Sequence, residues 1–185
     1  ASASPRRKEI LEKTGLKFKV DASDYEEEIN YSLRPHELAR FLSREKAKAI
    51  VNKYTNALII AADTFIVFKG KILGKPYTEE EAKRMLKMLN NRTHSVITGF
   101  TIIDTDDNKK LSGSVETKVY FKKLTIKEIE SYIKSKEPLD KAGAYAIQGL
   151  GAVIVKRIEG DYFNVMGLPL STLMETLKKF GIYVL

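Results

Sequence analysis

The stretch ALIIAADTFIVFKGKIL, residues 57–73, is strongly apolar on both sides of one carboxylate, that of Asp63. A short apolar run bounded by polar residues is typical of a buried β-strand. Residues 57–62 therefore predict a strand that ends at Asp63 and Thr64. Residues 65–73 predict a strand, a turn and a further strand, so a β-sheet stands at the centre of the expected fold.

Helix signals surround this segment. Helices are expected where a capping residue or a proline precedes apolar residues at helical spacing. They begin at Ser4–Pro5, at about Pro35 (running to about Tyr54), after Thr78, after Thr125 and at about Pro169. Each of the two threonines is followed three residues later by a glutamate, as in a capping box.

Further strands are expected at residues 16–23, 95–104 and 114–124, the last two joined by the polar turn 105–110. Residues 143–165 predict a strand-rich segment punctuated by glycines. Helices alternate with strands, yet several strands form hairpins. This order predicts a mixed α/β (α+β) fold, in which a mixed, largely twisted sheet is flanked by helices.

Composition narrows the class of protein. The 185 residues predict one domain, or two closely packed lobes that share a core. No apolar run approaches the ~18 residues of a membrane span, and the start carries no secretion signal. The chain has no cysteine and two histidines, which excludes thiol catalysis and histidine-rich metal centres. A metal would therefore be held by carboxylates and phosphate, as Mg²⁺ is.

The formal net charge of +8 favours an anionic partner without identifying it. Lysine and arginine are scattered among the acids, and no basic tail or five-residue basic run is present. Nucleic acid and a polyanionic small molecule both fit this excess.

The opening SASPRR raises a question of charge. Arg6 and Arg7 fall in the first turn of the expected helix, where the positive end of the dipole disfavours cations by roughly 0.3–1 kcal/mol. Both side chains could simply lie in water. The alternative is that an anion binds there, because Ser2 and Ser4 add hydroxyls to the helix N–H groups and the two guanidinium groups.

Other candidates are ambiguous when taken singly. Asp63 and Thr64 fit a ligand site at a strand end or the cap of a turn. Lys46 and Lys75 fit a phosphate site or ordinary solvated lysines, and Gln148 fits a reader of a base edge or the anchor of a turn. The acidic run at residues 26–28 is typical of a solvated face. His94 is expected to make a structural hydrogen bond.

Taken together, the motifs SASPRR, EE, REKAKA, AADT, GKP, THSVITG, EPLDKAGAYAIQG and VMGLPL occur in one order along nearly the whole chain. In this the sequence resembles the Maf family of nucleoside triphosphate pyrophosphatases. AADT together with GAYAIQG resembles the branch that acts on dTTP and UTP. The resemblance implies a fold like that of the inosine triphosphate pyrophosphatases, with two lobes and a central cleft. It also implies a cytoplasmic enzyme, a divalent cation (Mg²⁺ or Mn²⁺) and a homodimer.

The resemblance also implies roles for individual residues. Asp63 matches the proton acceptor, and Glu27 with Asp63 is expected to hold the metal. The residues that match specificity positions are Arg6, Thr64 and Gln148. Those expected to bind phosphate are Ser2, Ser4, Arg6, Arg7, Lys46 and Lys75. Residues 1–185 are expected to form one domain of this family, and a short apolar strand is expected to precede Ala1 in the native protein.

The expected reaction is metal-dependent hydrolysis of dTTP or UTP, or of a modified pyrimidine nucleotide, to the monophosphate and pyrophosphate. The partner is then a free nucleotide, and neither nucleic acid nor a membrane is required. One alternative is a non-enzymatic regulator of cell division that binds nucleotide or protein. A nucleic-acid binder, motivated by the charge, is a third hypothesis.

Overall fold

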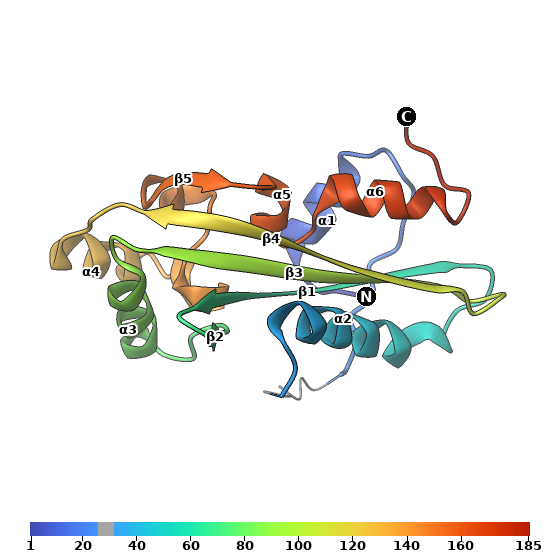
Figure 1. The fold of residues 1–185 in the computed structure, drawn as a ribbon, viewed down its shortest axis with the longest axis horizontal. Coiled ribbons are helices and arrows are strands. Elements are labelled where there is room, and N and C mark those ends of the chain that lie inside the picture. The colour runs from blue at the N-terminus through green and yellow to red at the C-terminus, as the bar shows by residue number, and fades with distance from the viewer. Residues whose placement is uncertain (26–31) are drawn as a thin grey trace. The chain divides into compact units, whose positions relative to one another are not determined.

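The computed structural model describes residues 1–25 and 32–185 (Figure 1). Within these residues five strands form one antiparallel sheet in the order β2-β1-β3-β4-β5. The strands are β1 (Leu58–Phe68), β2 (Lys71–Leu73), β3 (Thr93–Asp104), β4 (Lys110–Phe121) and β5 (Val155–Glu159). The α-helices are α1 (Pro5–Glu12), α2 (Pro35–Val51), α3 (Glu79–Leu89), α4 (Ile126–Lys134), α5 (Tyr162–Met166) and α6 (Leu170–Lys178). The 3₁₀ turns are η1 (Glu137–Asp140), η2 (Ala142–Ala144) and η3 (Gly149–Val153).

The chain divides into two compact units. The first unit comprises residues 1–64, 98–115 and 167–185, and the second comprises residues 65–97 and 116–166. Strands β1, β3 and β4 contribute residues to both. The mixed α/β fold with a helix-flanked sheet is confirmed, whereas the central cleft stays a prediction.

Strand β1 differs from the sequence prediction. The expected strand end at Asp63 is wrong, because β1 runs without a break from Leu58 to Phe68 and carries Asp63 and Thr64 in its middle. The chain then turns through Lys69 and Gly70, whose φ angles are 48° and 75°. Positive φ at both central residues is the requirement of a tight hairpin turn, and β2 pairs back onto β1 as expected.

In the first unit, helix α2 packs closely against β3. A Cβ atom at Gly99 would lie 2.1 Å from the carbonyl oxygen of Ala39, so only glycine permits this approach. Hydroxyls tie the same layers together: Ser43 of α2 bonds Thr101 of β3 at 2.8 Å, and Thr101 bonds Ser112 of β4 at 2.8 Å. Figure 1 shows α2 on one side of these strands and α1 and α6 on the other.

The second unit has its own apolar core. It is built from the end of β1, from β3 and β4, and from the apolar faces of α3 and α4. The capping box at the start of α4 is confirmed, with Thr125 and Glu128 bonding each other's backbone N–H. At the start of α3, Thr78 caps the N–H of Glu81, whose carboxylate bonds the N–H of Tyr77 instead of completing the box.

One predicted strand region is absent, and another is a strand only in part. Residues 16–23 form no strand. Of the predicted strand-rich segment 143–165, only β5 is a strand; η2 and η3 precede it and α5 follows it. Left-handed backbone at Gly143, Ala144 and Gly149 interrupts the extended conformation there. In the described part of the chain, no helix is long and apolar enough to cross a membrane.

His94 makes a structural hydrogen bond, as predicted from the sequence. Its Nε2 lies 2.7 Å from the hydroxyl of Tyr145, and its ring meets Phe121 and Tyr145 edge to face. Among the described residues its Nδ1 is buried without a hydrogen-bond partner. Burial lowers the pKa of His94 to about 4, because the charged ring would lose its hydration.

We predict that acid weakens the fold through His94. The folded state holds the ring neutral down to pH about 4, whereas the unfolded chain takes up the proton near pH 6.5. The free energy of unfolding therefore falls through this window, by about 2 kcal/mol between pH 7.5 and pH 5. Urea unfolding at both pH values measures this loss. His94→Phe should show a smaller loss, and an equal one would contradict the assignment.

Candidate active site

Asp63 and Thr64 lie in the middle of β1, where successive side chains point to opposite faces of the sheet. The Asp63 carboxylate contacts the ammonium group of Lys46 on α2. Thr64 Oγ1 instead lies 3.0 Å from Arg7 Nη2 of α1 and 2.9 Å from Thr98 Oγ1 of β3. Asp63 thus presents its carboxylate to α2, whereas Thr64 presents its hydroxyl to α1.

The Lys46–Asp63 ion pair is largely buried. The side chains of Lys46 and Asp63 are 14% and 8% exposed. Lys46 is three residues after Ser43 and four before Ile50, both buried, so it lies on the face of α2 that meets the sheet. Burying two ions costs several kcal/mol each, and apolar residues of similar size often stabilise a fold as well. We therefore interpret the Lys46–Asp63 pair as having a role in catalysis rather than in stability.

Arg7 joins three parts of the first unit through its guanidinium group. Its Nε donates to the carbonyl oxygen of Gly167 at 2.8 Å, and its Nη1 donates to Ser2 Oγ at 3.1 Å. Its third hydrogen bond, from Nη2, is the one to Thr64. One arginine therefore holds together the N-terminal segment, β1 and the chain that precedes α6.

These contacts give a structural reason for an arginine in the first turn of α1. The backbone of Ser4 has N-cap geometry, but its hydroxyl makes no capping bond, and its N–H donates to Ser2 Oγ at 3.2 Å. A helix N-terminus without a side-chain cap favours an anion. Arg6 lies in the same turn, and phosphate binding by Ser2, Ser4, Arg6 and Arg7 stays a prediction.

Two of the predicted site residues belong to the second unit. Lys75 is exposed in the loop after β2, next to the buried Pro76, and the carbonyl of the preceding Gly74 accepts a 2.8 Å hydrogen bond from the N–H of Gly143. Gln148 is half-buried and has an extended backbone where η3 begins. In the part of the chain that the structure describes, its side-chain amide makes no hydrogen bond.

Glu27, the other predicted metal ligand, lies outside the described residues. Among residues 1–25 and 32–185, no three His, Asp or Glu side chains gather as a metal site would require. Asp63 supplies carboxylate oxygens, one of which contacts Lys46. Mg²⁺ commonly takes one or two carboxylates and fills its remaining positions with water and substrate phosphates. The donor chemistry at Asp63 fits an ion of that kind.

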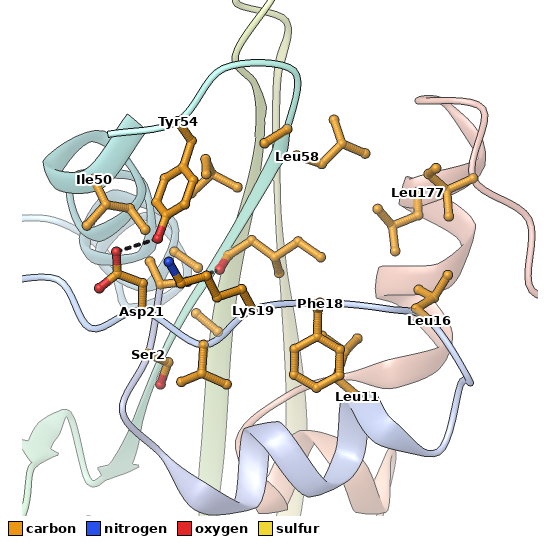
Figure 2. A pocket seen from close by; sticks show the side chains of 18 of the residues that line it. Ser2, Leu11, Leu16, Phe18, Lys19, Asp21, Ile50, Tyr54, Leu58 and Leu177 are labelled. Atoms are coloured by element: carbon orange, nitrogen blue, oxygen red, sulfur yellow. Dashed lines mark hydrogen bonds between the residues drawn. The ribbon is translucent and has the colours of Figure 1, made fainter. Parts of the chain in front are cut away.

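A groove of about 570 Å³ is also present in the first unit. Figure 2 shows Leu11, Phe18 and Leu177 among the side chains that line it. At one side of the groove, Tyr54 donates a 2.7 Å hydrogen bond to Asp21. This hydrogen bond lowers the pKa of Asp21. The groove is therefore mainly apolar, with charged side chains such as Arg7, Lys8 and Asp21 also in its lining.

This groove touches the candidate site without including its charged centre. Ser2 and Arg7 line it, but Lys46 and Asp63 do not. Phosphoryl transfer needs a cation and a proton acceptor held close together, and the buried Lys46–Asp63 pair supplies both. The candidate active site is therefore centred on the ion pair, not on the groove.

Sequence reasoning missed two residues of this cluster. Thr98 is fully buried and meets Thr64 because β1 and β3 are antiparallel neighbours, a register that the sequence alone does not specify. Gly167 binds Arg7 through its carbonyl and has a φ of 111°. Its position in the motif VMGLPL was the available signal for it.

Known proteins match this sequence over nearly its whole length. A family model described as Maf-like protein matches residues 1–180. A Carboxydothermus hydrogenoformans protein named dTTP/UTP pyrophosphatase is 50% identical over 181 residues, covering 98% of this chain and 97% of that protein. A Methanosarcina barkeri protein of the same name is 46% identical, covering 100% of this chain and 94% of its own. A Geobacillus protein of that name is 48% identical, covering 98% and 96%.

We predict that Lys46→Met lowers the free energy of unfolding by about 3–5 kcal/mol, because the Asp63 carboxylate is then buried against an apolar side chain. Urea unfolding measures the loss. Lys48→Met on the same helix is the matched control, since Lys48 pairs with Glu45 in an exposed position. The control should lose no more than about 1 kcal/mol. Equal losses from the two variants would contradict the importance of the buried pair.

Proposed function

This chain belongs to the Maf-like protein family, and we propose that it is a pyrophosphatase that hydrolyses dTTP and UTP. Water attacks the α-phosphorus, the bond from that phosphorus to the bridging oxygen breaks, and the monophosphate and pyrophosphate leave. Three relatives at 46–50% identity carry the name dTTP/UTP pyrophosphatase. The observation that carries the proposal is the buried Lys46–Asp63 pair, which sets a base and a cation side by side.

Charge neutralisation is the first task of such a site, since phosphoryl transfer depends mainly on positioning and electrostatics. Lys46 lies at the centre of the site, and Arg6 and Arg7 in the first turn of α1 are the other cations of the first unit that we assign to phosphate. Lys75 of the second unit is assigned the same role by its GKP motif. The hydroxyls of Ser2 and Ser4 add hydrogen-bond donors.

Asp63 is the group assigned to proton transfer. A general base must lie within hydrogen-bond reach of the water whose proton it accepts. Lys46 occupies Oδ1 of the carboxylate in the structure. An incoming phosphate offers the ammonium a second anionic partner, so Lys46 can turn to the substrate and leave Asp63 to accept the proton.

We also propose a divalent cation, Mg²⁺ or Mn²⁺, held by Asp63 and Glu27. When bound, such an ion polarises the α-phosphoryl group and offsets its charge. The residues assigned to substrate choice are Arg6, Thr64 and Gln148. Hydrogen bonds to Arg7 and Thr98 hold the hydroxyl oxygen of Thr64 in place. The homodimer implied by the resemblance stays a prediction.

A panel of UTP, dTTP, CTP and GTP, assayed with Mg²⁺ or Mn²⁺ for monophosphate and pyrophosphate, tests the proposal. We expect pyrophosphate from UTP and dTTP in preference to the others, and loss of turnover in EDTA. Release of inorganic phosphate with a nucleoside diphosphate would contradict the bond assigned. Nucleotide binding without turnover would favour the regulator, and salt-dependent binding of oligonucleotides would favour the nucleic-acid hypothesis.

We predict that Asp63→Asn keeps the fold and loses turnover on the order of 10²–10⁴-fold, the usual contribution of a general base. The fold is retained because the long stem of Lys46 can carry its ammonium group to water. Pyrophosphate release and circular dichroism measure the two effects. Asp107→Asn in the β3–β4 turn, where Asp107 bonds the N–H of Lys109, is the control. Near-normal turnover of Asp63→Asn would refute the assigned role.

Gln148→Ala should change base preference more than it slows the best substrate. Removing the amide takes away a donor and an acceptor that can pair with a pyrimidine edge, while the phosphate-binding groups stay in place. The ratios of kcat/KM among UTP, dTTP, CTP and GTP measure the effect. An unchanged ranking of the four nucleotides would count against Gln148 as a specificity residue.

A further inference from the structure

Gln148 lies on a loop, residues 146–151, that closes on itself. At its base the backbone of Gly151 packs against the carbonyl of Ala146, where a Cβ atom at residue 151 would lie 2.2 Å from the carbonyl oxygen. Gly149, next to Gln148, has a φ of 63°. Two glycines in six residues give such a loop many conformations unless other groups hold it.

The carboxylate of Glu137 binds one side of this loop. Its Oε2 accepts a hydrogen bond from the N–H of Leu150 at 3.0 Å, and its Oε1 accepts one from Gly151 at 2.9 Å. Gly149 packs on the same carboxylate, since a Cβ atom there would lie 2.5 Å from Oε2. Hydrogen bonds to an ionised acceptor are stronger than neutral ones, so this contact fixes the backbone just after Gln148.

The hydroxyl of Tyr132 binds the other side. It accepts a hydrogen bond from the N–H of Ala146 at 3.2 Å and donates one to Glu137 Oε1 at 2.8 Å. Tyr132 is buried on α4, so the hydroxyl starts from a rigid support. The two residues therefore hold the loop at both ends and leave Gln148 between the held points.

The restraint of loop 146–151 matters because Gln148 must distinguish one nucleotide base from another. Uracil and thymine present a carbonyl oxygen beside an N–H, whereas cytosine presents an amino group beside a ring nitrogen. An amide group carries a donor and an acceptor and can pair with either edge if it is free to reorient. Holding the backbone that bears the amide in one place limits the positions the amide can reach on the base, and so contributes to discrimination.

We propose that Glu137, supported by Tyr132, is a positioning residue that sets Gln148 to read the base of the substrate. The inference rests on the proposed function, because Gln148 must contact the base for its position to matter. Glu137 itself is not assigned any contact with the nucleotide. Its effect passes through the N–H groups of Leu150 and Gly151.

Glu137→Gln tests the proposal, since it keeps the shape of the side chain but puts an NH₂ group among N–H donors. We expect the UTP-to-CTP ratio of kcat/KM to fall on the order of tenfold, below the 10²-fold cost of misplacing a reacting group by 1 Å. The kcat for UTP should change less than the ratio. Glu128→Gln is the matched control, because Glu128 caps α4 without contacting the loop. An unchanged ratio in Glu137→Gln, or an equal fall in the control, would overturn the inference.

A double-mutant cycle separates positioning from a general loosening of the fold. If Glu137 acts through Gln148, Glu137→Gln should leave the UTP-to-CTP ratio of Gln148→Ala unchanged. An equal fall in the presence and absence of Gln148 would overturn the inference. The exchange rates of the Leu150 and Gly151 amide hydrogens should also rise in Glu137→Gln and stay as in the wild type in Glu128→Gln.

Tyr132→Phe provides a second route if Glu137→Gln does not fold. It removes one hydroxyl and should shift the ratio in the same direction by a smaller factor. No shift in this variant would overturn the inference.

The activity of the wild type shows whether the proposed function fails or only the inference about Glu137. If it releases no pyrophosphate from any nucleotide, the proposed function and this inference fail together. An active wild type with unchanged ratios in the variants removes the inference alone.

Discussion

The contact between Lys46 and Asp63 is the constraint on which the candidate site depends. It brings a charge into the middle of a buried strand and holds α2 against β1 at that point. Because the next residue, Thr64, faces the opposite side of the sheet, the same strand also presents a hydroxyl to Arg7. The site is therefore organised around two consecutive residues whose partners come from two different helices.

In each compact unit, one polar side chain holds a residue that we assign to substrate choice. That side chain binds segments that lie far apart in the sequence. In the first unit Arg7 donates to Gly167, Ser2 and Thr64. In the second unit Glu137 accepts from the loop that follows Gln148. Preorganised groups need no rearrangement at the moment of reaction, which is the basis of electrostatic catalysis. Both devices fit an enzyme that must recognise a small polar ligand.

Local signals predicted much of the fold, and long-range contacts account for what they missed. The helix beginning at Pro35, the β3–β4 hairpin and the capping box at Thr125 follow from spacing and turn chemistry. The strand end predicted at Asp63 is wrong because a carboxylate inside a strand needs a partner from another element. Family motifs predicted the residues of the site, but they did not predict that Lys46 contacts Asp63 or that Arg7 contacts Thr64. Thr98 and Glu137 escaped notice because strand register and loop closure are set by packing.

A crystal structure with α,β-imido-UTP, in which nitrogen replaces the bridging oxygen of the bond to be cleaved, would decide whether the Lys46–Asp63 pair is the catalytic centre. We expect the α-phosphate to lie beside the Asp63 carboxylate, with the ammonium group of Lys46 turned onto a phosphate oxygen. A triphosphate bound in the groove lined by Leu11, Phe18 and Leu177, with the Lys46–Asp63 contact intact, would show that the ion pair is not the catalytic centre.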